Sequence, residues 1–390
     1  MKNKKELELY LHMPFCVSKC AYCDFLSAPA SEAVQRAYTE QLIEEIMAAS
    51  AAYEEYQVTT VFFGGGTPSI VPGSWIEALM AAVKGEFSVS EDAEITIEMN
   101  PGTVSMEKLE SYRNAGINRI SIGLQSAEET ELRQLGRIHT YDDFLKTYQQ
   151  VRMAGFTNVS VDLMSALPGQ TFQSWEKTLK KVVMLKPEHI SAYSLIIEEG
   201  TPFYDRYGKT GCPGDYPPLP DEDEERKMYS FTGEYLKSHG YHQYEISNYS
   251  RPGHDCRHNV GYWTGIDYLG LGLGSASYID HCRFHNETDL ETYLKLDFEN
   301  GGLESLYQEI QHLSQEQRME EFMFLGLRLT EGVSGGDFIN HFGQNMWNVY
   351  GDVIDKLIAQ GLLELHQPNI KLTRRGIDLS NYVMAQFLLT

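Results

Sequence analysis

The first half of the chain alternates between two kinds of hydrophobic pattern. Short runs rich in β-branched and aromatic residues, such as VTTVFF at 58–63, are typical of buried strands. Longer stretches between them repeat apolar residues every three or four positions, as amphipathic helices do. The predicted strands cover residues 7–11, 58–63, 95–97, 119–123, 159–163 and 189–195. The predicted helices cover about 31–52, 75–84, 106–115, 141–154 and 172–185.

This alternation predicts an α/β fold. Strands that alternate with helices pair in parallel, because each helix returns the chain to the same end of the sheet. Six such strands, rather than eight, indicate an open, partial (β/α)6 barrel of the TIM type.

The chain after about residue 308 shows a different pattern. Helices are followed by two short strands that a polar turn at 367–369 joins, which predicts an α+β, winged-helix-like region. We expect three units: a barrel core at 1–205, an extension at 206–300 and the winged-helix-like domain at 301–390. The acidic run at 221–225 is expected to be a surface connection between barrel and C-terminal region.

Composition and charge narrow the function. A chain of 390 residues with 42% hydrophobic residues can bury one large core and a smaller appended domain. A formal net charge of -23 argues against nucleic acid as a partner, because phosphate binding needs clustered Lys and Arg. The N-terminal stretch resembles neither a signal peptide nor a membrane span, so we expect a cytoplasmic protein.

Three cysteines in one short loop carry the strongest chemical signal. Cys16, Cys20 and Cys23 form the spacing C-x3-C-x2-C directly after the first predicted strand. A structural zinc site would need a fourth ligand, and no second cysteine pair exists in the chain. A disulfide framework is disfavoured, because no secretory signal places the chain in an oxidising compartment. Three thiolates instead fit an iron-sulfur cluster with one iron left open.

Further polar signals follow the other predicted strands. The run Gly64-Gly65-Gly66-Thr67-Pro68 follows the second strand, and its glycines allow backbone to approach a ligand closely. Active sites of barrels lie at this end of the strands.

Glu98, Gln125 and Asp162 lie at the ends of the third, fourth and fifth strands. Each alone could be only a capping residue. Together, carboxylate and amide oxygens at one rim suit hydroxyl and ammonium groups, and Arg137 can bind a carboxylate through paired N–H donors.

The motifs identify a family by resemblance. The stretch LYLHMPFCVSKCAYCDF resembles the radical S-adenosylmethionine superfamily, in which the amino and carboxylate groups of that cofactor occupy the open iron. Together with FFGGGTPS, LGRIHT, ALPGQT and CRHNVGYW, it is similar to the family of oxygen-independent coproporphyrinogen III oxidase (HemN) and the heme chaperone HemW. The resemblance implies Cys16, Cys20 and Cys23 as cluster ligands. It implies S-adenosylmethionine contacts at Tyr10, Tyr22, Gly65, Gly66, Thr67, Glu98, Gln125, Arg137 and Asp162.

Two departures favour the chaperone-like branch over the decarboxylating one. The decarboxylating branch has a further cysteine where this chain has Phe25, and it has a long N-terminal extension, whereas only fifteen residues precede Cys16. We therefore expect a protein of porphyrin metabolism that binds heme and transfers it to an acceptor. The alternative is oxidative decarboxylation of coproporphyrinogen III, or another radical modification of a porphyrin.

The resemblance also implies cofactors and partners. The cofactors are a [4Fe-4S] cluster, S-adenosylmethionine and heme. The partners are a heme-acceptor protein and an electron donor such as flavodoxin or ferredoxin, with membrane contact only through the acceptor. If S-adenosylmethionine is cleaved, single-electron chemistry releases methionine and a 5'-deoxyadenosyl radical.

His258 is the candidate heme ligand. An imidazole can serve as an axial ligand of heme iron, and Tyr262 and Trp263 offer flat faces for a porphyrin. The alternative is that His258 and Asn259 tie a loop together while Tyr262 and Trp263 fill core. Cys256 is a further candidate for heme contact.

Overall fold

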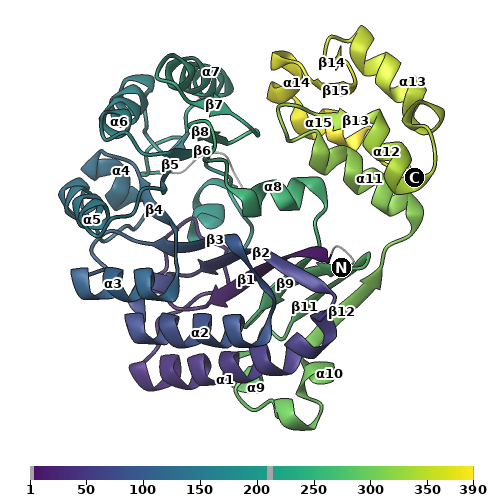
Figure 1. Cartoon of the computed structure of the whole chain (residues 1–390). Coiled ribbons are helices and arrows are strands. Elements are labelled where there is room, and N and C mark those ends of the chain that lie inside the picture. Colours follow the sequence, from purple (N-terminus) through teal and green to yellow (C-terminus); the bar gives the residue numbers. More distant parts are fainter. Residues whose placement is uncertain (1–3, 209–213, 390) are drawn as a thin grey trace.

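The computed structural model describes residues 4–208 and 214–389. Its largest feature is a twelve-stranded sheet with the order β12-β11-β10-β9-β1-β2-β3-β4-β5-β6-β8-β7 (Figure 1). A separate three-stranded sheet lies in the C-terminal part. Among the described residues, no helix is both long enough and apolar enough to cross a bilayer.

The centre of the large sheet is the predicted partial barrel. Its six strands pair in parallel in chain order. These are β1 (Lys5–Met13), β2 (Tyr56–Gly65), β3 (Val89–Met99), β4 (Arg119–Gln125), β5 (Val159–Ser165) and β6 (His189–Ser194). The crossover helices are α1 (Glu32–Ser50), α2 (Gly73–Glu86), α3 (Met106–Ala115), α4 (Glu129–Gln134), α5 (Tyr141–Met153) and α6 (Phe172–Met184). The α/β fold class is confirmed, and only the short α4 was not predicted.

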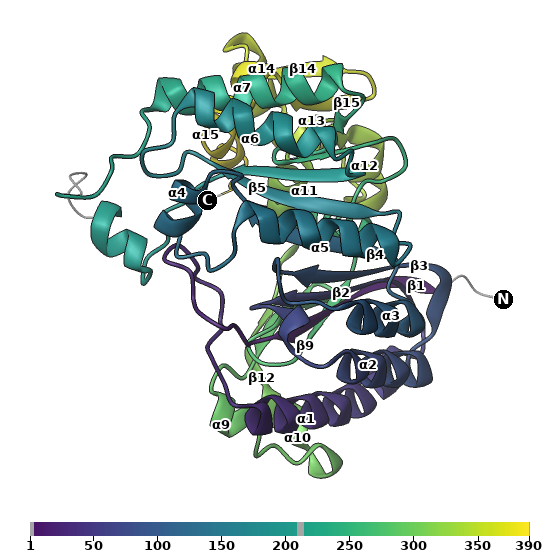
Figure 2. The ribbon, with the colours of Figure 1, turned by 90° about the vertical axis from the view of Figure 1, so that its left-hand side faces the viewer.

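Burial explains why these strands and helices could be predicted from the sequence. Every residue of β4 is buried, and α6 buries Trp175, Leu179 and Val182 along one face. Figure 2 shows α1, α2 and α3 side by side on the outer face of the sheet. The apolar strand faces and the helix stripes thus form one core, which burial from water stabilises.

Later strands occupy both edges of the barrel sheet. β1 pairs in parallel with β9 (Tyr268–Leu271), and β6 pairs antiparallel with β8 (Asn248–Ser250). The remaining strands of the sheet are β7 (His242–Gln243), β10 (Ala276–Ile279), β11 (Cys282–Asn286) and β12 (Tyr307–His312). Because both edges are already paired, the barrel does not close. The division at 205/206 and 300/301 stays a prediction, and the sheet itself runs across both boundaries.

The connecting segments add one long helix, α7, and several short ones. They are η1 (Ala51–Tyr53), η2 (Pro68–Ile70), η3 (Tyr204–Gly208), α7 (Glu222–Ser238), α8 (Arg257–Thr264), α9 (Leu290–Tyr293), η4 (Phe298–Asn300) and α10 (Gly302–Leu306). The acidic run at 221–225 lies at or near the surface, as expected, but it forms the start of a helix. Asp221 caps α7, and the four acidic residues after it form the first helical turn, where carboxylates interact favourably with the helix dipole.

The C-terminal part has its own core, built around Phe338, Tyr350 and Ile354. Its elements are α11 (Gln315–Gly326), β13 (Val333–Ser334), α12 (Gly335–Phe342), α13 (Met346–Ala359), β14 (Leu363–His366), β15 (Asn369–Leu372), α14 (Arg374–Asp378) and α15 (Ser380–Ala385). Three helices with a small strand between the first two, followed by the β14–β15 hairpin, give the winged-helix-like arrangement that was predicted.

Candidate functional site

A cavity of about 440 Å³ lies where the carboxyl ends of the barrel strands meet. We call it the rim cavity. All the cluster and S-adenosylmethionine residues inferred from the sequence line it, except Tyr10, whereas none of the candidate heme contacts does. The lining members are Cys16, Cys20, Cys23, Tyr22, Gly65, Gly66, Thr67, Glu98, Gln125, Arg137 and Asp162. Parallel pairing brings them together, because it sets every strand end at the same edge of the sheet.

The cysteine loop is anchored on the glycine run after β2. The Gly66 amide donates to the Met13 carbonyl at 2.9 Å, and the Thr67 amide donates to the Phe15 carbonyl at 2.8 Å. A Cβ atom on Gly66 would lie 2.6 Å from the Phe15 carbonyl oxygen. Glycine is therefore required here by the close approach of two backbones, and the loop position depends on it.

The three cysteines are free thiols at one end of the rim cavity. Burial raises the pKa of Cys23, and negative charge on Cys20 and Cys16 raises it further. The Cys16 Sγ lies 3.4 Å from the Thr67 Oγ1. Among the described residues, no three His, Cys, Asp or Glu side chains are placed to hold a single metal ion. In a cubane each thiolate binds a different iron, so three neighbouring thiolates with no fourth fit a [4Fe-4S] cluster with one open iron.

Two half-buried carboxyl groups, those of Glu98 and Asp162, line the same cavity as the cysteines. Burial, reinforced by the nearby Asp162, raises the pKa of Glu98 to about 8. Burial also raises the pKa of Asp162, although the Ser121 hydroxyl donates to both of its oxygens at 3.1 and 2.9 Å. A cation beside the two groups would favour their ionised forms. The sulfonium and ammonium groups of S-adenosylmethionine fit that requirement.

Arg137 and Gln125 form the polar side of the rim cavity. Arg137 donates to the Asn100 Oδ1 at 2.8 Å and to the Tyr22 hydroxyl at 3.0 Å. Its buried Nε has no hydrogen-bonding partner among the described residues, so one N–H remains for a ligand carboxylate. The Tyr193 hydroxyl donates to the Gln125 Oε1 at 2.9 Å.

Sequence reasoning missed several residues of this cavity, among them Tyr193, Asn100 and Arg328. Tyr193 is the penultimate residue of β6, and Asn100 directly follows β3, so the strand-end rule that found Glu98 would have found them. Arg328 also lines the rim cavity but comes from the turn after α11. No local signal marks it, because only the docking of the C-terminal part brings it to the barrel.

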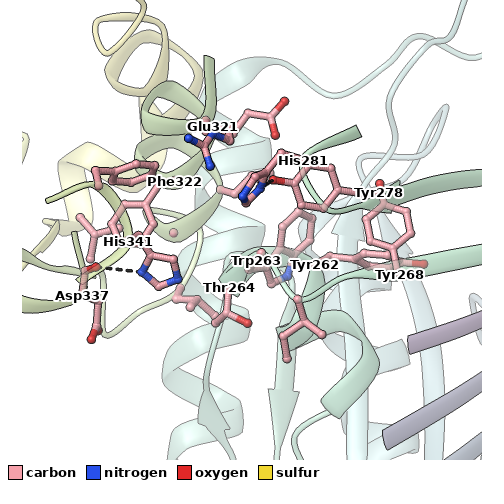
Figure 3. Close-up of a pocket in the computed structure, with 18 of the residues that line it drawn as sticks. Tyr262, Trp263, Thr264, Tyr268, Tyr278, His281, Glu321, Phe322, Asp337 and His341 are labelled. Atoms are coloured by element: carbon pink, nitrogen blue, oxygen red, sulfur yellow. Dashed lines mark hydrogen bonds between the residues drawn. The ribbon is translucent and has the colours of Figure 1, made fainter. Parts of the chain in front are cut away.

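A second cavity, of about 840 Å³, lies between the large sheet and the C-terminal helices α11 and α12 (Figure 3). We call it the interdomain cavity. Tyr10 lines this cavity rather than the rim cavity. Its hydroxyl lies 3.1 Å from the His12 Nδ1, and the negative charge of Glu98 adds to the burial that raises the pKa of Tyr10. The Tyr10 side chain thus lines the interdomain cavity while lying within electrostatic reach of Glu98, which lines the rim cavity. Tyr262 and Trp263 also line the interdomain cavity.

His258 lies outside both cavities. The imidazole is 2% exposed, and burial lowers its pKa to about 3. The Thr60 Oγ1 lies 2.7 Å from its Nδ1, and the Tyr262 hydroxyl lies 3.0 Å from its Nε2. The imidazole ring also stacks on the Phe62 ring, and the two ring centroids lie 5.0 Å apart. With both nitrogens hydrogen-bonded, this geometry favours the alternative in which His258 ties α8 to the barrel. Cys256 is likewise buried and outside both cavities.

Comparisons with known proteins agree with this architecture. Residues 10–182 match the radical SAM superfamily, and residues 313–379 match the HemN C-terminal domain. The chain is 35% identical over 386 residues to the heme chaperone HemW of Lactococcus lactis subsp. lactis (strain IL1403), covering 99% of this chain and 98% of the relative. It is 34% identical to the heme chaperone HemW of Escherichia coli (strain K12), covering 98% of each chain.

Two further matches extend the comparison. The chain is 34% identical to a mitochondrial radical S-adenosyl methionine domain-containing protein 1 of Danio rerio, covering 98% of this chain and 87% of that protein. The solved structure of Escherichia coli coproporphyrinogen III oxidase (HemN) superimposes with a TM-score of 0.82 at 22% identity, covering 99% of this chain and 91% of the other. At that identity the superposition shows a shared fold.

Proposed function

Since the chain belongs to the HemW family of radical S-adenosylmethionine proteins, we propose that it binds heme and transfers it to an acceptor protein. The observation that carries this proposal is the match to heme chaperones over nearly the whole length, which includes both the cysteine loop and the C-terminal domain. The rim cavity supports it, because the residues there fit the cluster and cofactor of the family.

Each side of the rim cavity has a distinct role in this proposal. The thiolates of Cys16, Cys20 and Cys23 hold the cluster. Glu98 and Asp162 bind the cationic end of S-adenosylmethionine. When bound and reduced, a [4Fe-4S] cluster supplies single electrons to that sulfonium. A cluster held by these cysteines would have a supporting or gating role in heme transfer.

Further contacts orient the cofactor. Arg137, whose Nε has no hydrogen-bonding partner among the described residues, would bind the carboxylate of S-adenosylmethionine. Tyr22 would lie beside the adenine, and the backbone of Gly65 and Gly66 would approach the cofactor. Gln125 and Thr67 complete the polar wall. Tyr10 contributes from the boundary with the interdomain cavity.

The partners in the proposal are heme, an acceptor protein and an electron donor such as flavodoxin or ferredoxin. We also propose a cytoplasmic location. Cysteines that bind a cluster must stay reduced, and Cys16, Cys20 and Cys23 form no disulfide.

A single anaerobic experiment tests the function. Reconstituted protein is mixed with S-adenosylmethionine, reductant and either heme or coproporphyrinogen III, and all products are identified. We expect heme to bind and pass to an apo-acceptor such as an apocytochrome, while coproporphyrinogen III remains unchanged. Phe25, which stands where the decarboxylating branch has cysteine, supports the second expectation. Conversion of coproporphyrinogen III to protoporphyrinogen IX, or failure to bind heme, would refute the proposal.

A further inference from the structure

Resting on the function proposed above, we propose that heme binds in the interdomain cavity, with the Nε2 of His341 as an axial ligand of the iron and Arg318 facing a propionate carboxylate. No sequence motif marks either residue, and the family match assigns neither. The inference comes from the shape, the polar groups and the charges of the cavity.

The walls of the interdomain cavity suit a flat apolar macrocycle. Tyr262, Tyr268 and Tyr278 line it on the side of the large sheet, and Phe322 and Phe342 line it on the side of the C-terminal domain (Figure 3). At about 840 Å³ it lies in the size range of small-molecule and cofactor sites. Aromatic side chains on both sides can stack on a porphyrin.

His341 presents an uncommitted nitrogen to this cavity. Its Nδ1 lies 2.8 Å from the backbone carbonyl oxygen of Asp337. A carbonyl only accepts hydrogen bonds, so Nδ1 carries the proton and the neutral ring has its lone pair on Nε2. Among the described residues, no polar partner occupies that Nε2. In Figure 3 the edge of the ring away from Asp337 faces into the cavity.

This arrangement is the one that metal-binding histidines use. A backbone carbonyl that accepts from one ring nitrogen fixes the tautomer and directs the other nitrogen to the metal. The His341 side chain is exposed and sits near the end of α12, so iron can reach it without opening the core. His258 lacks both properties, because it is buried and both of its nitrogens have partners.

Arg318 supplies a cation at the same cavity. Its buried Nε has no hydrogen-bonding partner, and within the described part of the chain no carboxylate lies within 4 Å of its guanidinium. The neighbouring Arg283 differs, because its two terminal nitrogens pair with the Glu321 carboxylate at 2.8 and 3.2 Å. Heme carries two propionate carboxylates, and guanidinium groups bind carboxylates through paired N–H donors. Arg318 is therefore the arginine left to bind one.

The first test is spectroscopic titration of hemin into the full-length protein and its variants. We expect His341→Ala to weaken hemin affinity at least tenfold and to shift the Soret band, while the matched control His366→Ala changes neither. His366 is an exposed histidine of the same domain that lies outside the cavity. Added imidazole should restore the original Soret position in His341→Ala, which a purely structural role for His341 would not allow.

Two outcomes of that titration would overturn the assignment. One is unchanged hemin affinity and spectrum in a folded His341→Ala protein. The other is loss of the axial-ligand spectrum in a folded His258→Ala or His281→Ala protein while His341→Ala remains normal. His281 is included because it also lines the cavity, with its Nδ1 3.4 Å from the Tyr278 hydroxyl.

The second test concerns the propionates. The native protein should bind hemin more tightly than hemin dimethyl ester, which lacks the carboxylates, and Arg318→Gln should reduce that preference severalfold. An unchanged preference would remove Arg318 from the site. These failures differ from failure of the proposed function: a native protein that binds no hemin refutes the function itself, whereas normal binding in every variant refutes only this location.

Discussion

The rim cavity places the half-buried Glu98 near Asp162, and we expect that arrangement to make cofactor binding depend on pH. The raised pKa of Glu98, about 8 without ligand, means that the carboxyl group is mostly protonated at pH 6 to 7. A cation binds the ionised form, so binding below pH 8 must release a proton. The same group favours the folded ligand-free protein at low pH, and this contribution is lost as pH rises through 8.

Glu98→Gln tests this linkage. The affinity of the native protein for S-adenosylmethionine should rise between pH 6 and 8 by up to about tenfold per unit and then level off. The variant should bind more weakly and lack that component of the pH dependence. Asp24→Asn is the control, because Asp24 is an exposed carboxylate at the same cavity. Isothermal titration at several pH values measures the difference, and equal slopes in native protein and Glu98→Gln would contradict the role of Glu98.

The cysteines give the second prediction at this scale. Changing Cys16, Cys20 or Cys23 to alanine should remove one of three ligands and abolish the cluster. Iron content and the electron paramagnetic resonance signal of anaerobically reconstituted protein measure it. Cys282→Ala is the matched control, since Cys282 is a half-buried free thiol in β11, away from the rim cavity. Full iron content in all three variants would contradict the assignment. Cys256 should also be dispensable for the cluster, as should Cys212, which lies outside the described residues.

Elements, rather than single side chains, set the position of the cysteine loop. The end of β1 and the glycine run after β2 hold the loop through backbone hydrogen bonds. The close approach at Gly66 leaves no room for a side chain, because an added Cβ would meet the Phe15 carbonyl at 2.6 Å. The backbone contact between these two elements therefore decides whether the thiols face the cavity.

Gly66→Ala should push the loop away from β2 and lower cluster content even though every cysteine is retained. Gly85→Ala is the control, because a Cβ on this α2 residue would meet nothing within 4 Å. That control should keep its cluster and gain roughly 0.5–1 kcal/mol in free energy of unfolding, as expected for glycine replaced in a helix. Iron analysis and urea denaturation measure the two effects, and normal iron content in Gly66→Ala would count against the loop argument.

At the scale of the whole molecule, the turn after α11 joins the C-terminal domain to the barrel edge. The Thr330 amide donates to the Tyr244 carbonyl at 3.0 Å, and Leu329 forms a bridge with Glu245. Arg328 lies with its Nη2 3.5 Å from the Glu245 Oε2, and its guanidinium lies 4.2 Å from the ring centre of Trp263. Arg328 also lines the rim cavity, so one side chain contacts the walls of both cavities.

Arg328→Met should lower the free energy of unfolding by roughly 3 kcal/mol, because it leaves the Glu245 carboxylate buried without its cation. The loss falls at the low end for buried pairs, since the Arg328 side chain is 30% exposed while that of Glu245 is 1% exposed. The double variant with Glu245→Gln should lose less than Arg328→Met alone, because the unpaired charge is gone. Chemical denaturation of the four proteins measures this, and a larger loss in the double variant would contradict the pairing.

The sequence by itself determined the barrel and most of the rim cavity. The buried runs of β2 and β4 and the apolar stripe of α6 are local patterns, because side-chain direction repeats every two residues in a strand and every 3.6 in a helix. Parallel crossovers then place every strand end at one edge. Glu98, Gln125 and Asp162 meet there for that reason. The cysteine spacing is equally local, since one loop contains all three thiols.

Only the tertiary structure decided how the later strands pair and where the remaining candidate side chains lie. β9 joins β1 from more than two hundred residues away, and strands as short as β7 and β8 carry too few residues for a periodic signal. The sequence indicated Tyr10 as a candidate cofactor contact and His258 as a candidate heme ligand. Strand register and packing, however, decide toward which side of the sheet each side chain points. The interdomain cavity brings Tyr262, Arg318 and His341 together from separate elements, because burial of the domain interface, and no local preference, positions them.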